Sequence, residues 1–220
     1  MRLVTALTPE AASLIEHYRL EKVDSSPMFP LYRNETIYLV ISGIGKTLAA
    51  AATAYLHTKS GELPNQPFLN IGIAGHQRAI TGTPMVASRI TDQSTGKTWY
   101  PSQIIRDSMD RSPLITVETV ERTYTQDAAY DMEAAGFYPV AWRASTAELV
   151  QSFKVISDHP GEPVADLDQQ RIQDLIGNCI DEIHSLVNAL QGLAGIVAST
   201  NPKSYSLEPF FERWHFSVTQ

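Results

Sequence analysis

The stretch TIYLVISGIGKTLAAAATAYL, from Thr36 to Leu56, decides the fold class. Its first third is rich in β-branched and aromatic residues, which is typical of a strand. Gly43 and Gly45 then mark a tight turn, and the alanine-rich remainder favours a helix that closes near Gly61. A strand that turns directly into a helix is the repeating unit of α/β proteins.

The same alternation of strand and helix continues on both sides of this unit. The apolar run from Leu3 to Leu7 predicts a strand, and a helix is expected after it, with Thr8 as its cap and Pro9 at its first position. Further elements are strands within 67–75, 83–93, 113–120 and 151–158 and an amphipathic helix over 166–195. This order predicts an α/β fold of three layers, in which helices flank a central mixed, mainly parallel sheet.

The length and composition indicate one main domain. The chain has 220 residues, of which 43% are hydrophobic, and this is enough to bury a sizeable core. We expect a single domain over residues 1–195. The segment 196–220 is irregular and rich in aromatic residues, so we expect a tail that packs on the domain.

Charge and cysteine content exclude several classes of function. The formal net charge of -7 argues against binding to nucleic acid, and no block of Lys or Arg suggests a membrane surface. Cys179 is the single cysteine, and no Cys/His cluster has the spacing of a metal site. The N-terminal segment becomes polar too early for a signal peptide, and no apolar run is long enough for a bilayer. We therefore expect a cytoplasmic protein without metal that binds neither nucleic acid nor membrane.

The SGIGKT turn invites comparison with nucleotide-binding loops, but it fits none of them. A phosphate-binding P-loop needs a glycine where Val40 stands, and a dinucleotide fingerprint needs one where Leu48 stands. We therefore expect no nucleotide cofactor, and indeed no bound organic cofactor. The turn still leaves backbone N–H groups free to point at a ligand.

Polar residues follow several of the expected strands. Ligands of α/β proteins gather at the carboxyl ends of strands, where Glu10, Gly75 and the Ser157–Asp158 pair lie. Ser157, Asp158 and His159 do not form a hydrolase triad, because neighbours on a strand point in alternating directions and no G-x-S-x-G turn is present. Taken singly, these residues are more typical of helix caps and turns than of a catalytic site.

Taken together, the motifs resemble one family. SGIGKTLAAAATAYL, LNIGIAG, DMEAAG and KVISD follow one another in the order found in the nucleoside phosphorylase and nucleosidase superfamily. The nearest likeness is to methylthioadenosine/S-adenosylhomocysteine nucleosidases, and ALTPEAASL is similar to the segment that carries that family's glutamate. The resemblance runs from about Leu3 to Leu190. It implies cleavage of the N-glycosidic bond of a purine nucleoside and a nucleoside phosphorylase-like fold.

The resemblance also implies a role for each site residue. Asp158 matches the aspartate that protonates N7 of the leaving purine, and Ser157 orients it. Glu133 matches the carboxylate that accepts hydrogen bonds from the ribose hydroxyls, and Met132 lies beneath the sugar. Glu10 matches the glutamate that activates water. The remaining expected lining consists of Ala74, Gly75 and Val120. Asp131 either shares the ribose site or supports the fold.

The resemblance leaves hydrolysis and phosphorolysis open, with hydrolysis favoured. Ile73 stands where both branches commonly carry a hydroxyl residue, and Arg78 is the best candidate if phosphate binds. Lys154 stands where many relatives have arginine. These departures also leave open a noncatalytic nucleoside-binding protein on the same fold.

The segment before DMEAAG looks shorter than in the usual nucleosidases. In those proteins it supplies a phenylalanine that stacks on the base, and here Val120, Glu121 and Tyr124 are the candidate lining. The family also implies a homodimer in which a neighbouring subunit completes the pocket. The expected partners are therefore a small nucleoside and a second copy of the chain.

Overall fold

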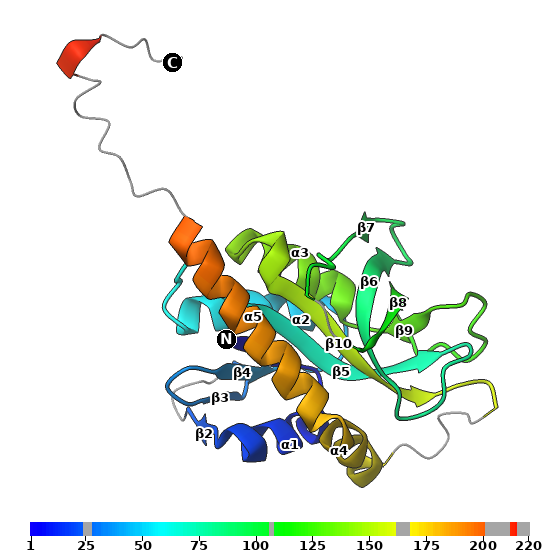
Figure 1. Ribbon diagram of the computed structural model, residues 1–220. Coiled ribbons are helices and arrows are strands. Elements are labelled where there is room, and N and C mark those ends of the chain that lie inside the picture. Colours follow the sequence, from blue (N-terminus) through cyan, green and yellow to red (C-terminus); the bar gives the residue numbers. More distant parts are fainter. Residues whose placement is uncertain (24–27, 106–107, 162–167, 201–211, 215–220) are drawn as a thin grey trace.

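The computed structural model describes residues 1–23, 28–105, 108–161, 168–200 and 212–214 (Figure 1). The strands are β1 (Arg2–Thr5), β2 (Glu21–Lys22), β3 (Leu31–Arg33), β4 (Tyr38–Ile41), β5 (Phe68–His76), β6 (Pro84–Asp92), β7 (Thr98–Trp99), β8 (Asp110–Thr116), β9 (Ala129–Asp131) and β10 (Val150–Asp158). The helices are α1 (Thr8–Tyr18), α2 (Lys46–Lys59), α3 (Ala134–Ala144), α4 (Gln169–Asn178) and α5 (Ile180–Thr200), with a short 3₁₀ turn at Ala147–Leu149. The α/β class is confirmed.

The strands form one mixed sheet that closes on itself. β5, β10, β6, β8 and β9 pair in a ring, and β1, β4, β3 and β2 extend it from β5. Parallel pairings join β1 to β4 and β5, β5 to β10, and β8 to β6 and β9, while the other pairings are antiparallel. The expected layered sheet is therefore realised as a mixed sheet with a closed part.

The long strand β5 brings distant parts of the chain together. One edge of β5 pairs with β10 over almost its whole length. On its other edge, β1 pairs with the first residues of β5 and β9 pairs with Gly75 and His76 at its end. β9 runs antiparallel to β5 and pairs with it beyond the point where β1 stops, so the chain that leaves β1 and the chain that leaves β9 run toward each other. They meet near the end of β5, with which the end of β10 also pairs.

Two hydrophobic cores lie on the two faces of the sheet. α2 and α3 pack on one face, where the small side chains of Ala49, Ala52 and Ala141 are fully buried. α1, α4 and α5 pack on the other face, and α5 crosses β5 and β10 in Figure 1. No helix within the described ranges is long and apolar enough to cross a membrane.

Three expectations about helices need correction or limits. α1 begins at Thr8 and its N-cap is Leu7, so Thr8 is not the cap. The single helix expected over 166–195 is two helices, because the backbone of Cys179 leaves the helical conformation and both helices still reach the same core. α5 continues through the expected domain boundary at 195/196 to Thr200. The expected packing of the tail lies outside the described residues, apart from 212–214.

Gly136 is required where α3 meets the start of α2. A Cβ at this position would overlap the carbonyl of Lys46 and lie 2.7 Å from Lys46 Cα, and both are backbone atoms that cannot turn aside. We expect Gly136→Ala to lower the free energy of unfolding by about 1–3 kcal/mol in urea titrations, despite the better helix propensity of alanine.

Gly192 provides the matched control for this substitution. It also lies in a helix, α5, but a Cβ there would meet nothing within 4 Å. Gly192→Ala is expected to leave stability unchanged or raise it by up to about 1 kcal/mol. Equal responses of the two glycines would show that the close approach of α2 and α3 is not what fixes Gly136.

Candidate active site

The ends of β1, β5, β9 and β10 surround a cavity of ≈ 230 Å³. Every residue that the sequence assigned to the site lines this cavity, and the set consists of Glu10, Ala74, Gly75, Val120, Met132, Glu133, Ser157 and Asp158. These residues come from five separate stretches of the chain. The closed part of the sheet and the neighbouring strand β1 therefore bring together the acidic groups that the motifs predicted.

Asp158 and Ser157 both reach the cavity because the end of β10 is irregular. Ile156 pairs with Ala74 and Asp158 pairs with Gly75, so Ser157 is an extra residue in a bulge. A bulge of this kind overrides the usual alternation of side chains. The Ser157 hydroxyl donates to Asp158 Oδ1 at 2.6 Å, and the carboxyl group is only 3% exposed. This hydrogen bond places Ser157 where it can orient the Asp158 carboxyl group.

Glu133 is fixed by the glycine turn that opens α2. Its Oε1 accepts a hydrogen bond from the N–H of Gly45 at 2.8 Å, and its Oε2 accepts one from the N–H of Met132 at 3.3 Å. Gly45 has a φ of 103°, which is open to glycine and strained for other residues. The SGIGKT turn therefore presents its backbone N–H to a carboxylate of the site. Met132 packs on the small cluster that includes Tyr124 and Tyr130.

Glu10 folds back on the chain that leaves β1. Its Oε2 accepts from the N–H groups of Ala6 and Leu7 at 2.9 and 2.8 Å, and its Oε1 accepts from the N–H of Ile73 at 3.0 Å. Burial raises the pKa of Glu10, against the opposing effects of the nearby Lys154 charge and these N–H groups. A carboxylate has about four acceptor sites, so one stays available for a water molecule in the cavity.

Lys154 and Asp131 form a buried support beneath the site. The Lys154 ammonium lies 2.9 Å from Asp131 Oδ2, and the two side chains are 1% and 0% exposed. Asp131 also accepts hydrogen bonds from the Thr116 hydroxyl and the Ala134 N–H. These contacts engage both of its oxygens and favour a supporting role, although Asp131 also belongs to the lining of the cavity.

Lys154 is also the counter-charge of the two glutamates. Burial alone would lower the pKa of Lys154, but the charges of Asp131, Glu133 and Glu10 raise it above its usual value. Gly72 makes room for this arrangement, because a Cβ there would lie 2.8 Å from Glu10 Oε1 and 3.4 Å from Lys154 Nζ. The single buried ammonium of Lys154 is therefore the shared counter-charge of the carboxylates of Asp131, Glu133 and Glu10.

The arginine proposed for phosphate binding lies elsewhere. Arg78 is exposed and forms an ion pair with Asp127 at 3.1 Å. It belongs to the lining of a second, more polar cavity and not to that of the candidate site. Among the described residues, no arginine lines the cavity that holds the three acidic groups.

Ser112 and His76, which line that second cavity, are not a nucleophile and its base. His76 Nδ1 accepts hydrogen bonds from the N–H groups of Arg78 and Ala79 at 2.9 and 3.0 Å. In the neutral imidazole, which burial favours by lowering the pKa of His76, the proton must then be on Nε2. Nε2, 3.2 Å from the Ser112 hydroxyl, is a donor and cannot take the serine proton.

Two tyrosines line the cavity, and the sequence indicated one of them, Tyr124, as candidate lining but did not indicate Tyr130. Tyr124 was one of several candidates in the segment before β9, and Tyr130 lies within β9 itself. Tyr124 donates a hydrogen bond from its hydroxyl to Asp158 Oδ2. The only sequence signal for Tyr124 was that it is an aromatic residue in the segment before DMEAAG, where the family has a phenylalanine that stacks on the base.

Glu133 predicts how stability depends on pH. Burial first, and then the Asp131 charge, raise the pKa of Glu133 from 4.5 to about 7. Between these pH values the folded state binds more protons than the unfolded chain, so this group makes stability fall as pH rises. Glu133→Gln keeps an acceptor for Gly45 but does not titrate. From about pH 5 to about pH 8 the variant is expected to gain about 1–3 kcal/mol relative to the wild type in urea titrations.

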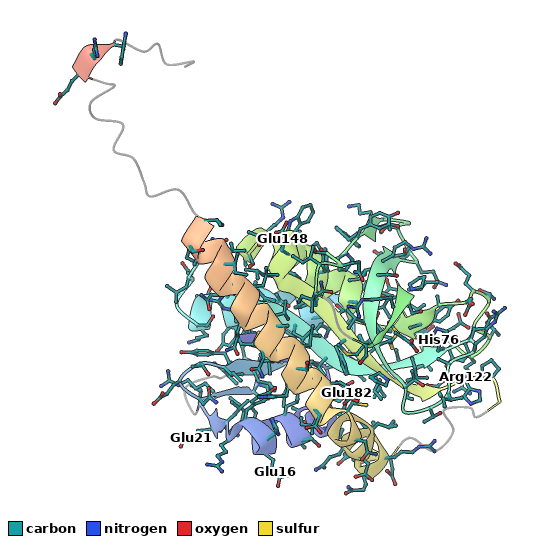
Figure 2. All side chains as sticks on the ribbon, viewed as in Figure 1. Glu16, Glu21, His76, Arg122, Glu148 and Glu182 are labelled. Atoms are coloured by element: carbon teal, nitrogen blue, oxygen red, sulfur yellow. The ribbon has the colours of Figure 1, made fainter. Side chains whose placement is uncertain are left out.

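Glu16 offers the control for the pH experiment. It lies exposed on α1 (Figure 2) and does not line the cavity. Glu16→Gln is expected to follow the wild-type stability across the same pH range. A Glu133→Gln protein that also parallels the wild type would show that Glu133 is ionised in the folded protein throughout.

Comparison with known proteins is informative at the level of structure. No protein-family model matches the chain, and no curated protein matches its sequence. The structure of an MTA/SAH nucleosidase aligns with a TM-score of 0.71 and 14% identity, over 87% of this chain and 95% of that one. The apo 5'-methylthioadenosine nucleosidase of Arabidopsis thaliana gives 0.69 and 16%, over 87% and 95%. The MTA/SAH nucleosidase of Colwellia psychrerythraea, solved with adenine, gives 0.65 and 18%, over 86% and 93%.

The chain therefore has the fold of the nucleoside phosphorylase and nucleosidase superfamily, and the resemblance seen in its motifs is confirmed for the fold. Within that superfamily, these three matching structures are all nucleosidases of the methylthioadenosine type. At identities of 14–18% the likeness establishes the architecture, and the activity has to be argued from the site.

Proposed function

We propose that this protein hydrolyses the N-glycosidic bond of a purine nucleoside, in the manner of methylthioadenosine/S-adenosylhomocysteine nucleosidases. The observation that carries the proposal is the convergence of Glu10, Glu133 and Asp158 on one cavity that no described arginine lines. The helices on both faces of the sheet support the finer description of a three-layer, nucleoside phosphorylase-like architecture as part of the same proposal.

The reaction assigns one task to each acidic group. Asp158, in its protonated form, donates to N7 of the purine while the bond between C1′ and N9 breaks. Glu133 accepts hydrogen bonds from the ribose hydroxyls, and its negative charge stabilises the electron-poor sugar. Glu10 takes a proton from the water that attacks C1′. The products are the free base and the ribose moiety, and the proton that water loses balances the one that the base gains.

The reaction is tested by a nucleoside panel in which phosphate is varied. Methylthioadenosine, adenosine and inosine are incubated with the protein, and the released base and sugar are separated by chromatography. Hydrolysis gives the free sugar at a rate that does not depend on phosphate. Strict dependence on phosphate, with a sugar 1-phosphate as product, would move the protein to the purine nucleoside phosphorylases.

A noncatalytic nucleoside-binding protein is the second candidate. The contact that favours it is the hydrogen bond from Tyr124 to Asp158, since both oxygens of the candidate acid are already engaged. Binding of a nucleoside without release of base, measured on the same panel, would support this alternative.

We also propose that the protein is a homodimer. Ile44 and Val120 line the cavity and yet are 54% exposed, and Leu48 on the first turns of α2 is 43% exposed. Apolar residues of this size at the mouth of a site suit coverage by a second subunit. The mass of the purified protein in solution, measured by light scattering, tests the proposal. The cytoplasmic location expected from the sequence stays a prediction.

A further inference from the structure

Tyr124 lies where the base of a nucleoside is expected. Its ring is packed on Gly75, so closely that a Cβ added there would lie 2.6 Å from the ring carbons. The side chain is 3% exposed, and its ring meets that of Tyr130 edge-on at 5.4 Å between centroids. Asp158 is the residue assigned to the base, Gly75 belongs to the expected lining of the cavity, and Tyr124 contacts both.

The Tyr124 hydroxyl is hydrogen-bonded to the carboxyl group of Asp158, the proposed proton donor. It donates to Oδ2, while Ser157 donates to Oδ1. Burial, and then the contact with Asp158, raise the pKa of Tyr124, so its phenol stays protonated and remains a donor. A purine that is to receive a proton from Asp158 needs one of these oxygens. Ser157 and Tyr124 each engage one of them, so a base that approaches Oδ2 competes with the phenol for the same atom.

The segment that carries Tyr124 is held near its two ends by ion pairs and at Tyr124 by the contacts with Asp158 and Gly75. It joins β8 to β9, and Arg122 marks it in Figure 2. Near the start of the segment, Glu118 Oε1 forms an ion pair with Lys46 Nζ at 2.5 Å. Near its end, Asp127 forms an ion pair with Arg78. Between them, Glu121 Oε1 accepts from the N–H groups of Arg122 and Thr123 and closes a local turn.

The backbone at Tyr124 is strained. Its φ is 43°, in the left-handed region that bulky residues seldom occupy, at a cost on the order of 1–3 kcal/mol. Strain of this kind persists where the surroundings hold the residue, and the contacts with Asp158 and Gly75 are such surroundings. If those contacts are broken, relief of the strain favours a different position of Tyr124.

We propose that Tyr124 occupies the base subsite of the free protein and that a leaving base must displace it to reach Asp158. The inference rests on the proposed function, because it is the function that assigns this part of the cavity to the base. Displacement also removes a donor from Asp158.

The test measures the affinity for adenine, which needs no turnover. Adenine is titrated calorimetrically into the wild type and into Tyr124→Phe. The variant keeps the ring but has no hydroxyl to give up, and a hydrogen bond to a charged group corresponds to roughly 10- to 100-fold in affinity. Tyr124→Phe is therefore expected to bind adenine at least about 10-fold more tightly.

Tyr138→Phe is the matched control. Tyr138 is also buried, at 2% exposure, but lies in α3 outside the cavity, so its substitution is expected to leave the adenine affinity unchanged. A second readout follows amide hydrogen exchange within 118–128, which is expected to accelerate when adenine binds to the wild type. Thermal unfolding of each variant confirms that it is folded.

Two outcomes overturn the inference. Equal or weaker binding of adenine by Tyr124→Phe would mean that Tyr124 is not displaced, and that its hydroxyl contacts the base or supports the site. Failure of both proteins to bind adenine would equally end it. In either case the release of base by the wild type on the nucleoside panel decides the proposed function separately.

Discussion

Asp158→Asn is expected to release purine base from methylthioadenosine about 10²–10⁴-fold more slowly than the wild type. The amide has nearly the size of the carboxyl group, and its oxygen still accepts the hydrogen bond from Ser157. It has no acidic proton to give to N7, so the leaving group must depart with its charge uncompensated. The rate constant of single-turnover base release, measured at saturating substrate, isolates this step from binding.

A second buried aspartate separates loss of the acid from loss of structure. Asp92 is 8% exposed and accepts hydrogen bonds from Lys46, Ser94 and Thr95, but it does not line the cavity. Asp92→Asn is expected to lower stability and to keep most of the turnover. If Asp158→Asn also keeps most of the turnover, Asp158 is not the general acid, and the proposed mechanism fails at its first step.

The site could be predicted from the sequence because its residues follow strands. Glu10 and Asp158 come at the carboxyl ends of β1 and β10, which run parallel to β5, and parallel strands bring such ends to one edge. Glu133 follows β9, which runs antiparallel to β5 and pairs only with its last two residues, so its place in the site depends on that pairing. The sequence also predicted the glycine turn of SGIGKT, but it did not predict which group the backbone N–H of this turn would contact. That Gly45 would donate to Glu133 depends on how α2 meets α3, and the two residues are 88 positions apart.

Other features depend on pairings that no local pattern encodes. The ring closes because β9, only three residues long, pairs with both β5 and β8. Tyr124 belongs to a segment without period, so its contact with Asp158 follows from tertiary packing alone. The sequence predicted α4 and α5 as a single helix, because their apolar faces pack in the same core and keep one helical spacing. Cys179, where the helix is interrupted, is not a helix-breaking residue.

The partnership of Lys154 with Asp131 is a further case. A lysine in the middle of a central strand is unusual, because charged groups are seldom buried without a partner. The sequence marked Lys154 only as a departure from the arginine of similar proteins, and it left Asp131 undecided. In the structure, Lys154 on β10 and Asp131 on β9 form an ion pair, and each is the charged partner that the other needs in the core. They can meet because β9 and β10 pair with opposite edges of β5 near its end.

Lys154→Met is expected to be the most destabilising single substitution of the site, at about 3–5 kcal/mol in urea titrations. Methionine fills a similar volume but leaves Asp131, Glu10 and Glu133 without their shared counter-charge. A loss of this size is a large share of the roughly 5–15 kcal/mol that typically holds a domain together. Lys154→Arg keeps the charge and is expected to lose much less, although its wider head group must fit a side-chain site that is 1% exposed.

A double substitution decides whether the cost of Lys154→Met arises from the uncompensated charge. Lys154→Met with Asp131→Asn removes the ammonium and the carboxylate nearest to it, so the pair is expected to cost less than the sum of the two single changes. The single variant should also be more stable near pH 5 than near pH 8, because without Lys154 the buried carboxyls bind protons more readily in the folded state than in the unfolded chain. Strict additivity together with a pH-independent loss would assign the cost to packing, and the charge of Lys154 would then have no part in holding Glu10 and Glu133 ready for a nucleoside.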